Sequence, residues 1–423
     1  MKISLLTTGT RGDTQPYIAL GVELKKLGHS VKLAGFENYR QLVEHHHLEF
    51  HPIKGDLEKV MKEMADASIE SDGPLKFFTS FKKMKPIIKD KQLGMQRDLF
   101  EACEGADAII YHPGAAIGHF AGAHFGVPTV LATPFPMAAT KEYPALIFYR
   151  TRWGRVTNFL SHKVFEFGFW RTVKGSIADF WKDRFGTLPP NFKNPYNEFG
   201  KGEHASIVSL SPHVFPVSHT HTKCYGYWFL EEDMKEWEPP RELVAFIKEG
   251  PPPIYIGFGS ILEENPEQTI ELVSEALKNS GQRGIVNLPV DLRNIHKYEN
   301  MYFVRNVPHT WLFPKLAGVV HHGGAGTSAV TFRSGIPSVV IPHGNDQFAW
   351  GKRSEELGVG APPIPRKELT VNRLTEGINH MLSSAKIERA HQLEDKIKKE
   401  HGARDAARFI EDFIKKNTLH KKD

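Results

Sequence analysis

The sequence predicts an α/β protein built from two Rossmann-like domains that face a central cleft. Short apolar strands alternate with helices in the first third of the chain, and the same alternation returns after residue 254. An acidic and then proline-rich segment separates the two runs. The length of 423 residues also favours two or three domains over one. Such alternation implies parallel sheets with right-handed crossovers.

The first domain is expected over residues 1–230. Its predicted strands are Ile3–Thr7, Ser30–Gly35, Leu48–Ile53, Asp107–Tyr111, Pro128–Thr133 and Ala205–Leu210. One helix is expected from about Gln15 to Leu27, where Gly28 is a natural stop, and another from about Gly114 to Phe125. Residues 140–200 read as inserted helices and loops rich in aromatic and basic residues.

Residues 231–253, which include Pro239-Pro240 and Pro251-Pro252-Pro253, are expected to link the domains. The second domain is expected over residues 254–400 and begins a new alternation of strands and helices. Its predicted strands are Ile254–Phe258, Gly284–Leu288, Met301–Val304, Gly318–His321 and Ser338–Ile341, and its predicted helices are Pro266–Asn279, Thr327–Ser334, Asp346–Leu357 and Val371–Leu382. The stretch Glu388–Lys416 reads as helical, and residues 401–423 are expected to pack back on the first domain.

Composition excludes several classes of protein. With 40% hydrophobic and 24% charged residues the chain is of ordinary globular type, and a formal net charge of +5 does not argue for nucleic acid. The two cysteines stand far apart without metal-ligand spacing, which fits a reducing cytoplasm. The N-terminal apolar run is too short for a signal peptide, and no apolar run is long enough to cross a bilayer. We therefore expect a cytoplasmic protein.

Four loops at the expected carboxyl ends of strands carry the candidate chemistry. The first, Thr8-Gly9-Thr10-Arg11-Gly12-Asp13-Thr14-Gln15-Pro16, offers glycines for close approach to a ligand and a helix N-terminus that suits an anion. It matches neither the dinucleotide fingerprint nor the P-loop. From this loop alone, Asp13 is either a catalytic carboxylate or, together with Thr14, a candidate helix N-cap.

The second loop is Val319-Val320-His321-His322-Gly323-Gly324-Ala325-Gly326-Thr327, where a strand runs into a small-residue turn that opens a helix. Backbone N–H groups at such a turn hold diphosphates, and an imidazole adds a charge-assisted hydrogen bond. The alternative is that the small residues only allow close packing of the helix on the sheet, with exposed histidines. The coincidence of both signals at a strand end favours phosphate binding.

The third loop, Ile341-Pro342-His343-Gly344-Asn345-Asp346-Gln347, places a carboxylate beside an amide, a pair that suits sugar hydroxyls, unless Asp346 is an N-cap. In the fourth loop, Gly257-Phe258-Gly259-Ser260, glycines let the backbone approach a ligand. His45-His46-His47 and the pair His219 and His221 are weak metal candidates. No two aspartates stand two residues apart, so the Asp-x-Asp motif that holds Mg²⁺ or Mn²⁺ in other sugar transferases is missing.

Taken together and in this order, the loops resemble family 1 glycosyltransferases of the GT-B fold, in the sterol/lipid and antibiotic-aglycone glucosyltransferase branch. The segment Gly9–Pro16 matches that branch's Gly-Ser-Arg-Gly-Asp-Val-Gln-Pro. Val307-Pro308-His309-Thr310-Trp311-Leu312-Phe313-Pro314 and His321–Thr327 match its nucleotide-binding signature. The resemblance covers nearly the whole chain except about residues 60–100 and 140–225.

The resemblance implies an inverting, metal-independent transfer of a hexose, by expectation glucose, from a UDP-sugar to a hydroxyl of an apolar acceptor such as a sterol, terpenoid, lipid or polyketide or phenolic aglycone. It implies no cofactor beyond the UDP-sugar co-substrate. Asp13 would be the base, and Val307 would contact the nucleotide base through its backbone. The remaining implied donor-binding residues are Gly9, Thr10, Arg11, Gly12, Gly259, Ser260, His321, Gly323, Gly324, Ala325, Gly326, Thr327, Asp346 and Gln347.

The match departs from the branch at two places. Where the branch reads Pro-Phe-Phe-Gly-Asp-Gln, this chain has Pro342-His343-Gly344-Asn345-Asp346-Gln347. Plant relatives stack a tryptophan on uracil where this chain has Asn306, so the UDP preference over dTDP rests on the branch. The alternatives to a transferase are a nucleotide-sugar epimerase or hydrolase of the same fold, and a non-catalytic protein that binds sugar nucleotides.

Two inserted segments suggest an apolar acceptor and peripheral contact with the inner face of a membrane. Between Tyr149 and Phe185 there are ten aromatics, eight Lys/Arg and three Asp/Glu, and from Leu75 to Arg97 there are seven Lys/Arg and one acid. Aromatic residues with basic neighbours suit an apolar pocket or an anionic lipid surface. The alternative is that these are ordinary amphipathic helices packed on the sheet with solvated lysines.

Overall fold

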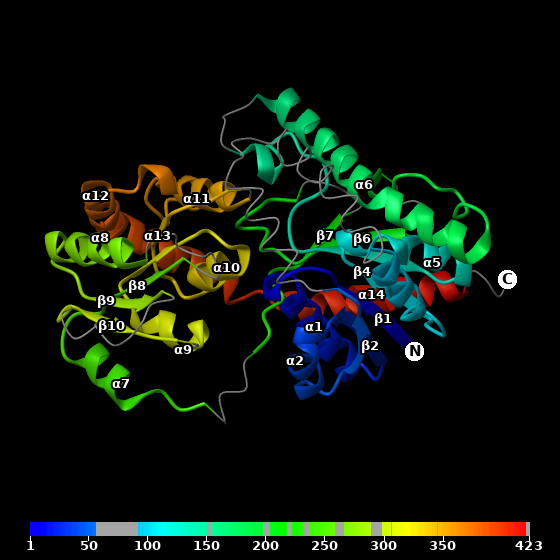
Figure 1. Cartoon of the computed structure of the whole chain (residues 1–423), viewed down its shortest axis with the longest axis horizontal. Helices are drawn as coiled ribbons and strands as arrows, with labels where there is room; N and C mark the ends of the chain where they lie inside the picture. The colour runs from blue at the N-terminus through cyan, green and yellow to red at the C-terminus, as the bar shows by residue number, and fades with distance from the viewer. Residues whose placement is uncertain are drawn as a thin grey trace. The chain divides into compact units, whose positions relative to one another are not determined.

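The computed structural model of the chain describes residues 1–55, 92–149, 154–197, 204–217, 222–231, 237–258, 266–288, 298–305, 307–344 and 346–419 (Figure 1). It divides into two compact units, and each is described by itself. The first unit comprises Met1–Phe148, Arg152–Leu230 and Glu400–Asp423, and the second comprises Tyr149–Thr151 and Glu231–Lys399. None of the helices among the described residues combines the length and the hydropathy needed to cross a membrane.

The first unit is built on a seven-stranded parallel sheet in the order β3-β2-β1-β4-β5-β6-β7. Its strands are β1 Lys2–Leu6, β2 Ser30–Phe36, β3 Glu49–Ile53, β4 Ala108–Tyr111, β5 Thr129–Thr133, β6 His204–Val208 and β7 Thr222–Cys224. Every residue of β4, β5 and β6 is buried, because helices cover both faces of the sheet and leave no polar face. The short strand β7 was not expected from the sequence.

The helices of the first unit pack on the two faces of this sheet. They are α1 Arg11–Lys26, α2 Arg40–His45, α5 Ile117–Phe125, α6 Arg155–Phe185 and α14 Gly402–Leu419, with one further helical stretch over residues 92–101. Although α14 comes from the end of the chain, it lies beside α1 (Figure 1), and its Ile410 and Ile414 are buried in the same apolar cluster as Ile18 and Leu20. The predicted helical stretch Glu388–Lys416 is two helices, since residues 398–401 separate α13 from α14.

Helix α6 turns its large aromatic residues toward the sheet. Phe165, Trp170, Phe180 and Trp181 are buried in a cluster that also contains Phe120 of α5. The aromatic residues that were considered for an acceptor pocket therefore form core, with the exposed Phe167 as an exception. Trp153 and most of the second segment, Leu75–Arg97, lie outside the described residues.

The second unit has a five-stranded parallel sheet in the order β10-β9-β8-β11-β12. Its strands are β8 Ile254–Gly257, β9 Gly284–Asn287, β10 Met301–Phe303, β11 Gly318–His321 and β12 Ser338–Val340. Its helices are α7 Arg241–Lys248, α8 Pro266–Asn279, α9 His309–Leu312, α10 Ala325–Arg333, α11 Gln347–Glu356, α12 Val371–Met381 and α13 Ser384–Ile397. Helix α7 falls within the segment expected as a linker, and its Leu243 is buried beside Tyr255.

Two parallel sheets flanked by helices confirm the predicted α/β fold class. One boundary differs in a way that matters for the site. Helix α1 begins at Arg11, four residues before the expected Gln15, so the first candidate loop is largely helical. Pro16 consequently lies inside the helix rather than in its first turn.

Candidate active site

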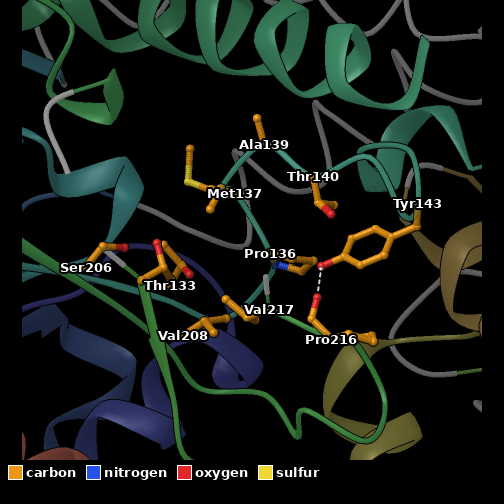
Figure 2. A pocket seen from close by; sticks show the side chains of 12 residues that line it. Thr133, Pro136, Met137, Ala139, Thr140, Tyr143, Ser206, Val208, Pro216 and Val217 are labelled. Carbon is orange, nitrogen blue, oxygen red and sulfur yellow. Dashed lines mark hydrogen bonds between the residues drawn. The ribbon is translucent and has the colours of Figure 1, made fainter. Parts of the chain in front are cut away.

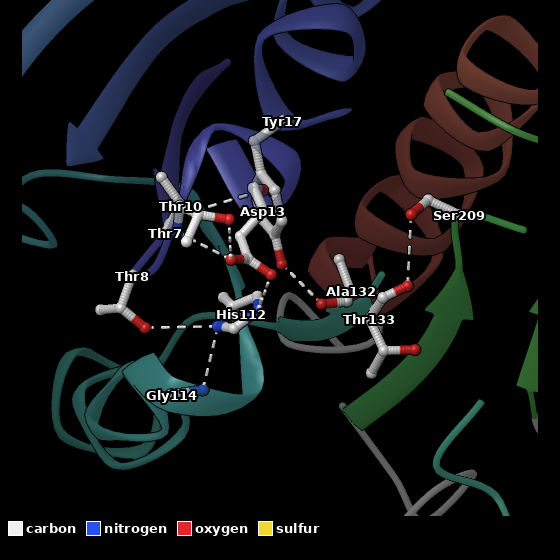
Figure 3. A network of polar contacts seen from close by, with 10 residues as sticks. All are labelled: Thr7, Thr8, Thr10, Asp13, Tyr17, His112, Gly114, Ala132, Thr133 and Ser209. Carbon is white, nitrogen blue, oxygen red and sulfur yellow. Dashed lines mark hydrogen bonds and ion pairs between the residues drawn. The ribbon is translucent and has the colours of Figure 1, made fainter. Parts of the chain in front are cut away.

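The loop after β1 and the loop after β4 emerge side by side from the sheet of the first unit. The two strands are parallel neighbours, with Leu6 opposite Tyr111, and the His112 N–H donates to the Leu6 carbonyl at 2.8 Å. Because the carboxyl ends of parallel strands meet at one edge, residues distant in sequence come together there. Asp13 and His112 face each other at this meeting point (Figure 3).

Asp13 occupies the third position of α1 and is held by the residue that caps the helix. Its Oδ2 accepts the Thr10 backbone N–H at 2.8 Å and the Thr10 hydroxyl at 3.0 Å, while Thr10 itself is the N-cap. The N-cap alternative for Asp13 and Thr14 is therefore wrong in position. The carboxylate supports the helix start from inside, and 27% of the side chain remains exposed.

Glycines make room for this arrangement. Gly9 has φ +131°, and a Cβ there would stand 2.3 Å from Asp13 Oδ2. Gly114 is equally constrained, because its Cβ would stand 2.3 Å from the Thr8 hydroxyl oxygen. Gly12, by contrast, lies in the first turn of α1 with no crowding, so its role is not to allow a tight turn. The first loop needs one glycine for its geometry rather than two.

His112 was not among the residues that sequence reasoning selected. Its Nδ1 accepts the Gly114 N–H at 3.1 Å and lies 3.3 Å from the Thr8 hydroxyl oxygen, and its Nε2 lies 3.6 Å from Asp13 Oδ1. The imidazole packs edge-on against the rings of Tyr17 and Phe135. A signal was present in the sequence, since a histidine followed by Pro113-Gly114 at a strand end repeats the setting of the other candidate loops.

Tyr17 joins this network to the next strand of the sheet. Its hydroxyl donates to the Ala132 carbonyl at 2.5 Å (Figure 3), and burial raises the pKa of its phenol well above the ordinary value, with the Asp13 charge as a second cause. Tyr17 therefore remains a neutral hydrogen-bond donor near the carboxylate.

A narrow pocket opens beside this network, at the carboxyl ends of β5 and β6. Its lining is mostly apolar and contains a few hydroxyl groups (Figure 2). The lining residues are Thr133, Pro136, Met137, Ala138, Ala139, Thr140, Tyr143, Ser206, Val208, Pro216, Val217 and Thr222. The Tyr143 hydroxyl donates to the Pro216 carbonyl at 3.1 Å and so ties two walls together. No residue of α6 lines it.

In the second unit, the turn after β11 has the geometry of an anion site. Gly324 is the N-cap of α10, so the N–H groups of Ala325, Gly326 and Thr327 belong to the first turn of the helix and lack the usual intrahelical acceptors. Gly323 has φ +90°, and a Cβ there would stand 2.8 Å from the Gln347 carbonyl. The turn can therefore adopt this conformation beside Gln347 only because glycine occupies the position.

The two histidines of this turn differ. His321 is 1% exposed and its Nδ1 accepts the Gly323 N–H at 3.1 Å, so the neutral ring carries its proton on Nε2. Burial lowers the pKa of His321 well below 6.5, with neighbouring His322 and His309 as further causes. Burial also lowers the pKa of His322 to about 4. Both rings are therefore neutral at pH 7 in the absence of an anion.

Asp346 and Gln347 stand at the start of α11. Asp346 occupies the N-cap position, yet its carboxylate does not cap the helix and instead accepts the Trp350 indole N–H at 3.2 Å. Gln347 Oε1 accepts the His343 N–H at 2.8 Å, which fixes the amide and leaves its NH₂ group as a donor. Asp346 is therefore the N-cap residue of α11 by position, but its side chain does not accept a hydrogen bond from the backbone of the helix.

Other predicted residues fall in different places. Arg11 and Gly12 are exposed in the first turn of α1, and Val307 is half-buried beside the apolar cluster of α9. Gly259, Ser260, Asn306 and Asn345 lie outside the described residues, as do His219 and His221. Across the part of the chain that the structure describes, no group of three or more His, Cys, Asp or Glu side chains could hold a metal ion.

The chain is similar to known proteins over most of its length. Residues 3–144 match the glycosyltransferase family 28 N-terminal domain, and residues 284–408 match the C-terminal domain of erythromycin biosynthesis protein CIII-like proteins. A sterol 3-beta-glucosyltransferase of Arabidopsis thaliana is 34% identical over 95% of this chain and 66% of its own length. One from Komagataella phaffii is 32% identical over 97% of this chain and 34% of its own length. The chain thus spans less than two thirds of these relatives.

Solved structures show the same fold. The glycotransferase of kitacinnamycin superposes with a TM-score of 0.72 at 19% identity, covering 98% of this chain and 99% of the other. The glycosyltransferase VinC in complex with dTDP gives a TM-score of 0.68 at 16% identity, covering 98% and 100%. Both belong to the GT-B fold. From the two matched domains, the sterol glucosyltransferase relatives and this fold, the chain belongs to the family 1 glycosyltransferases, in the branch that contains the sterol and antibiotic enzymes.

Proposed function

We propose that this protein is an inverting UDP-glycosyltransferase that moves glucose from UDP-glucose to a hydroxyl of an apolar acceptor, with sterols as the leading class. The observation that carries the proposal is the Asp13 carboxylate, which is held at the carboxyl end of the first sheet next to an apolar pocket. The names of the relatives, sterol 3-beta-glucosyltransferases, support the donor and the acceptor class. We assign acceptor binding to residues 1–230 and donor binding to residues 254–400.

In the proposed reaction the acceptor oxygen forms a bond to the anomeric carbon while the bond from that carbon to the diphosphate oxygen breaks. The electron pair of the broken bond leaves with UDP, and the hydroxyl proton passes to the Asp13 carboxylate. A carboxylate is a weak base for an alcohol, so proton transfer is late and concerted with attack. The held geometry of Asp13 supports this role, because its Oδ2 is fixed by Thr10 and its Oδ1 is available to the acceptor.

The leaving diphosphate needs positive potential. The first-turn N–H groups of α10 and the Nε2–H of His321 supply donors for it, and Gly323 and Gly324 let the backbone approach. In this proposal Asp346 and Gln347 bind the sugar hydroxyls, and Val307 contacts the nucleotide base. Gly259, Ser260 and the first-loop residues Gly9, Thr10, Arg11 and Gly12 remain predicted donor contacts. No metal ion takes part.

The acceptor is assigned to the pocket between Thr133 and Val217. This pocket starts one residue beyond Ala132, which accepts the Tyr17 hydroxyl of the Asp13 network. Its mostly apolar lining and its few hydroxyls suit an apolar acceptor with a single polar end. Because the cavity has a volume of only about 10 Å³, the acceptor must move its walls apart on binding. The pocket replaces the aromatic residues of α6 as the proposed acceptor surface.

The proposal is tested by incubating the purified protein with UDP-glucose and a panel of sterols, terpenoids, phenolics and free sugars, with detection of added hexose by mass spectrometry. We expect hexose on apolar acceptors only, and its loss in Asp13→Asn. Glycosylation of strongly polar compounds alone would reject the acceptor class. Turnover of UDP-glucose without any acceptor would favour the epimerase or hydrolase, and binding without turnover would favour a non-catalytic protein.

We further propose peripheral contact with an anionic membrane through the outward face of α6. Among the described residues, most exposed large apolar side chains lie on this helix, at Val156, Leu160, Val164 and Phe167. Their spacing of three and four residues forms one stripe, on the face opposite the buried Phe165 and Phe180. Over residues 155–174 the exposed positions of α6 also carry four basic side chains, at Arg155, Lys163, Arg171 and Lys174, and no acidic one.

This combination of apolar and basic residues matches a lipid surface with negative headgroups. Lys163 is partly neutralised by Glu166 at 2.8 Å, and Arg171 lies over the Phe167 ring. We expect the protein to co-float with vesicles that contain phosphatidylserine, and the double variant Val164→Glu, Phe167→Glu to stay behind. The matched control is Leu188→Glu, an exposed apolar residue outside α6. Flotation of the double variant equal to that of the control would reject this surface.

A further inference from the structure

The His112 imidazole is immobilised on several sides. Its Nδ1 accepts the Gly114 N–H at 3.1 Å and lies 3.3 Å from the Thr8 hydroxyl oxygen. The rings of Tyr17 and Phe135 meet it edge-on at centroid distances of 6.1 and 6.5 Å. Only 8% of the side chain is exposed. The ring is thus fixed in orientation, and its second nitrogen, Nε2, lies toward Asp13 (Figure 3).

The partner at Nδ1 fixes the tautomer. A backbone N–H can only donate, so Nδ1 carries no proton in the neutral ring and the proton is on Nε2. This Nε2 is buried and has no hydrogen-bond partner within ordinary range. The nearest acceptor is Asp13 Oδ1 at 3.6 Å, a separation that a displacement of less than about 1 Å turns into a hydrogen bond.

The two oxygens of Asp13 therefore have separate neighbours. Thr10 holds Oδ2 with two hydrogen bonds, and the His112 Nε2–H faces Oδ1. A carboxylate oxygen has two lone pairs, so Oδ1 accepts from His112 and still has one lone pair for the proton of an acceptor hydroxyl.

We infer that His112 is a positioning residue for the base: its Nε2–H orients Asp13 Oδ1 toward the acceptor hydroxyl. The inference rests on the proposed function, in which Asp13 is the base. A hydrogen bond from an uncharged donor orients the carboxylate and lowers its basicity less than a positive charge beside it would. Because Nε2 already carries a proton, His112 does not take the transferred proton, and Asp13 keeps it.

The test compares His112→Phe, which keeps the ring packing and removes the donor, with His112→Gln, which keeps an N–H donor. Removing one hydrogen bond to a charged group is worth roughly a tenfold change. We expect His112→Phe to lower kcat about tenfold with the KM for UDP-glucose nearly unchanged, and His112→Gln to retain most of the activity. The matched control is His29→Phe, because His29 pairs with Glu411 at 3.4 Å and precedes β2 at the amino end of the sheet, whereas Asp13 lies at its carboxyl end.

A double-mutant cycle separates positioning from a general effect on folding. In the Asp13→Asn background, His112→Phe should cost almost nothing further, because there is no carboxylate left to orient. An equal loss in both backgrounds, or a His112→Phe protein with wild-type kcat, would overturn the inference alone. If Asp13→Asn itself retains near-normal turnover, the base assignment fails, and the inference about His112 fails with it.

Discussion

Asp13 has a structural role at the start of α1 and a proposed chemical role, and two substitutions separate them. As the third residue of α1 it accepts two hydrogen bonds from Thr10 at 2.8 and 3.0 Å. Asp13→Ala removes both and leaves the Thr10 N–H without its partner, a loss of about 1 kcal/mol for a helix cap. For a domain of 150–250 residues this lowers Tm by roughly 2–4 °C. Asp13→Asn keeps an oxygen that accepts the Thr10 N–H, so its Tm should change by a fraction of that amount.

The loss of activity should be similar in the two variants, unlike the loss of stability. An asparagine cannot take a proton from the acceptor hydroxyl, so both variants lose general-base catalysis, which is typically worth about 10²–10⁴-fold. We expect kcat to fall at least about 10²-fold in Asp13→Asn and in Asp13→Ala, with the affinity for UDP-glucose little changed.

The assay combines thermal unfolding, calorimetric titration with UDP and initial rates with a sterol acceptor. The pattern expected is a stable but inactive Asp13→Asn and a less stable, equally inactive Asp13→Ala. If Asp13→Asn keeps near-normal turnover, Asp13 serves only to support the start of α1. If the two variants show the same decrease in Tm and kcat falls in proportion to that decrease, the loss of activity results from unfolding and not from the loss of a catalytic base.

Three further predictions concern the second unit, metal ions and pH. His321→Ala should weaken UDP binding in calorimetry more than His322→Ala, because the Nε2–H of His321 is the proposed donor to the diphosphate; the opposite order would reverse the assignment. EDTA should leave turnover unchanged, and a loss that Mn²⁺ or Mg²⁺ restores would refute metal independence. Burial lowers the pKa of His162 to about 4, so below about pH 6.5 the unfolded chain binds a proton that the native ring refuses, and stability falls as pH falls from about 6.5 toward 4. His162→Gln, which can keep the donor to the Tyr143 carbonyl, should show a flatter fall of Tm over this window; an unchanged slope would show that other groups dominate it.

Much of this protein could be predicted from local sequence. Short runs of branched apolar residues between turn-forming residues identified most of the strands, and the alternation with helices identified the parallel sheets, because both patterns reflect burial that is repeated within a few residues. The small-residue turns after β1 and β11 were identifiable in the same way, and the structure requires glycine at Gly9 and Gly323 because a Cβ there would collide with neighbouring residues of the chain. The loop composition also carried the family resemblance.

What the sequence left open depended on contacts between distant residues. Helix α1 starts at Arg11 because Thr10 and Asp13 form a capping box there. Apolar periodicity, which placed the start near Gln15, does not detect this polar first turn. The sequence of α6 did not show which face of the helix is buried, because both faces carry apolar side chains. Packing on the sheet buries one of them. His112 became a neighbour of Asp13 because β4, which follows β3 in the chain, pairs with β1. Strand order in a parallel sheet is decided by long-range crossover packing. The set of residues that meet beside Asp13 is therefore fixed only when the whole first unit has folded.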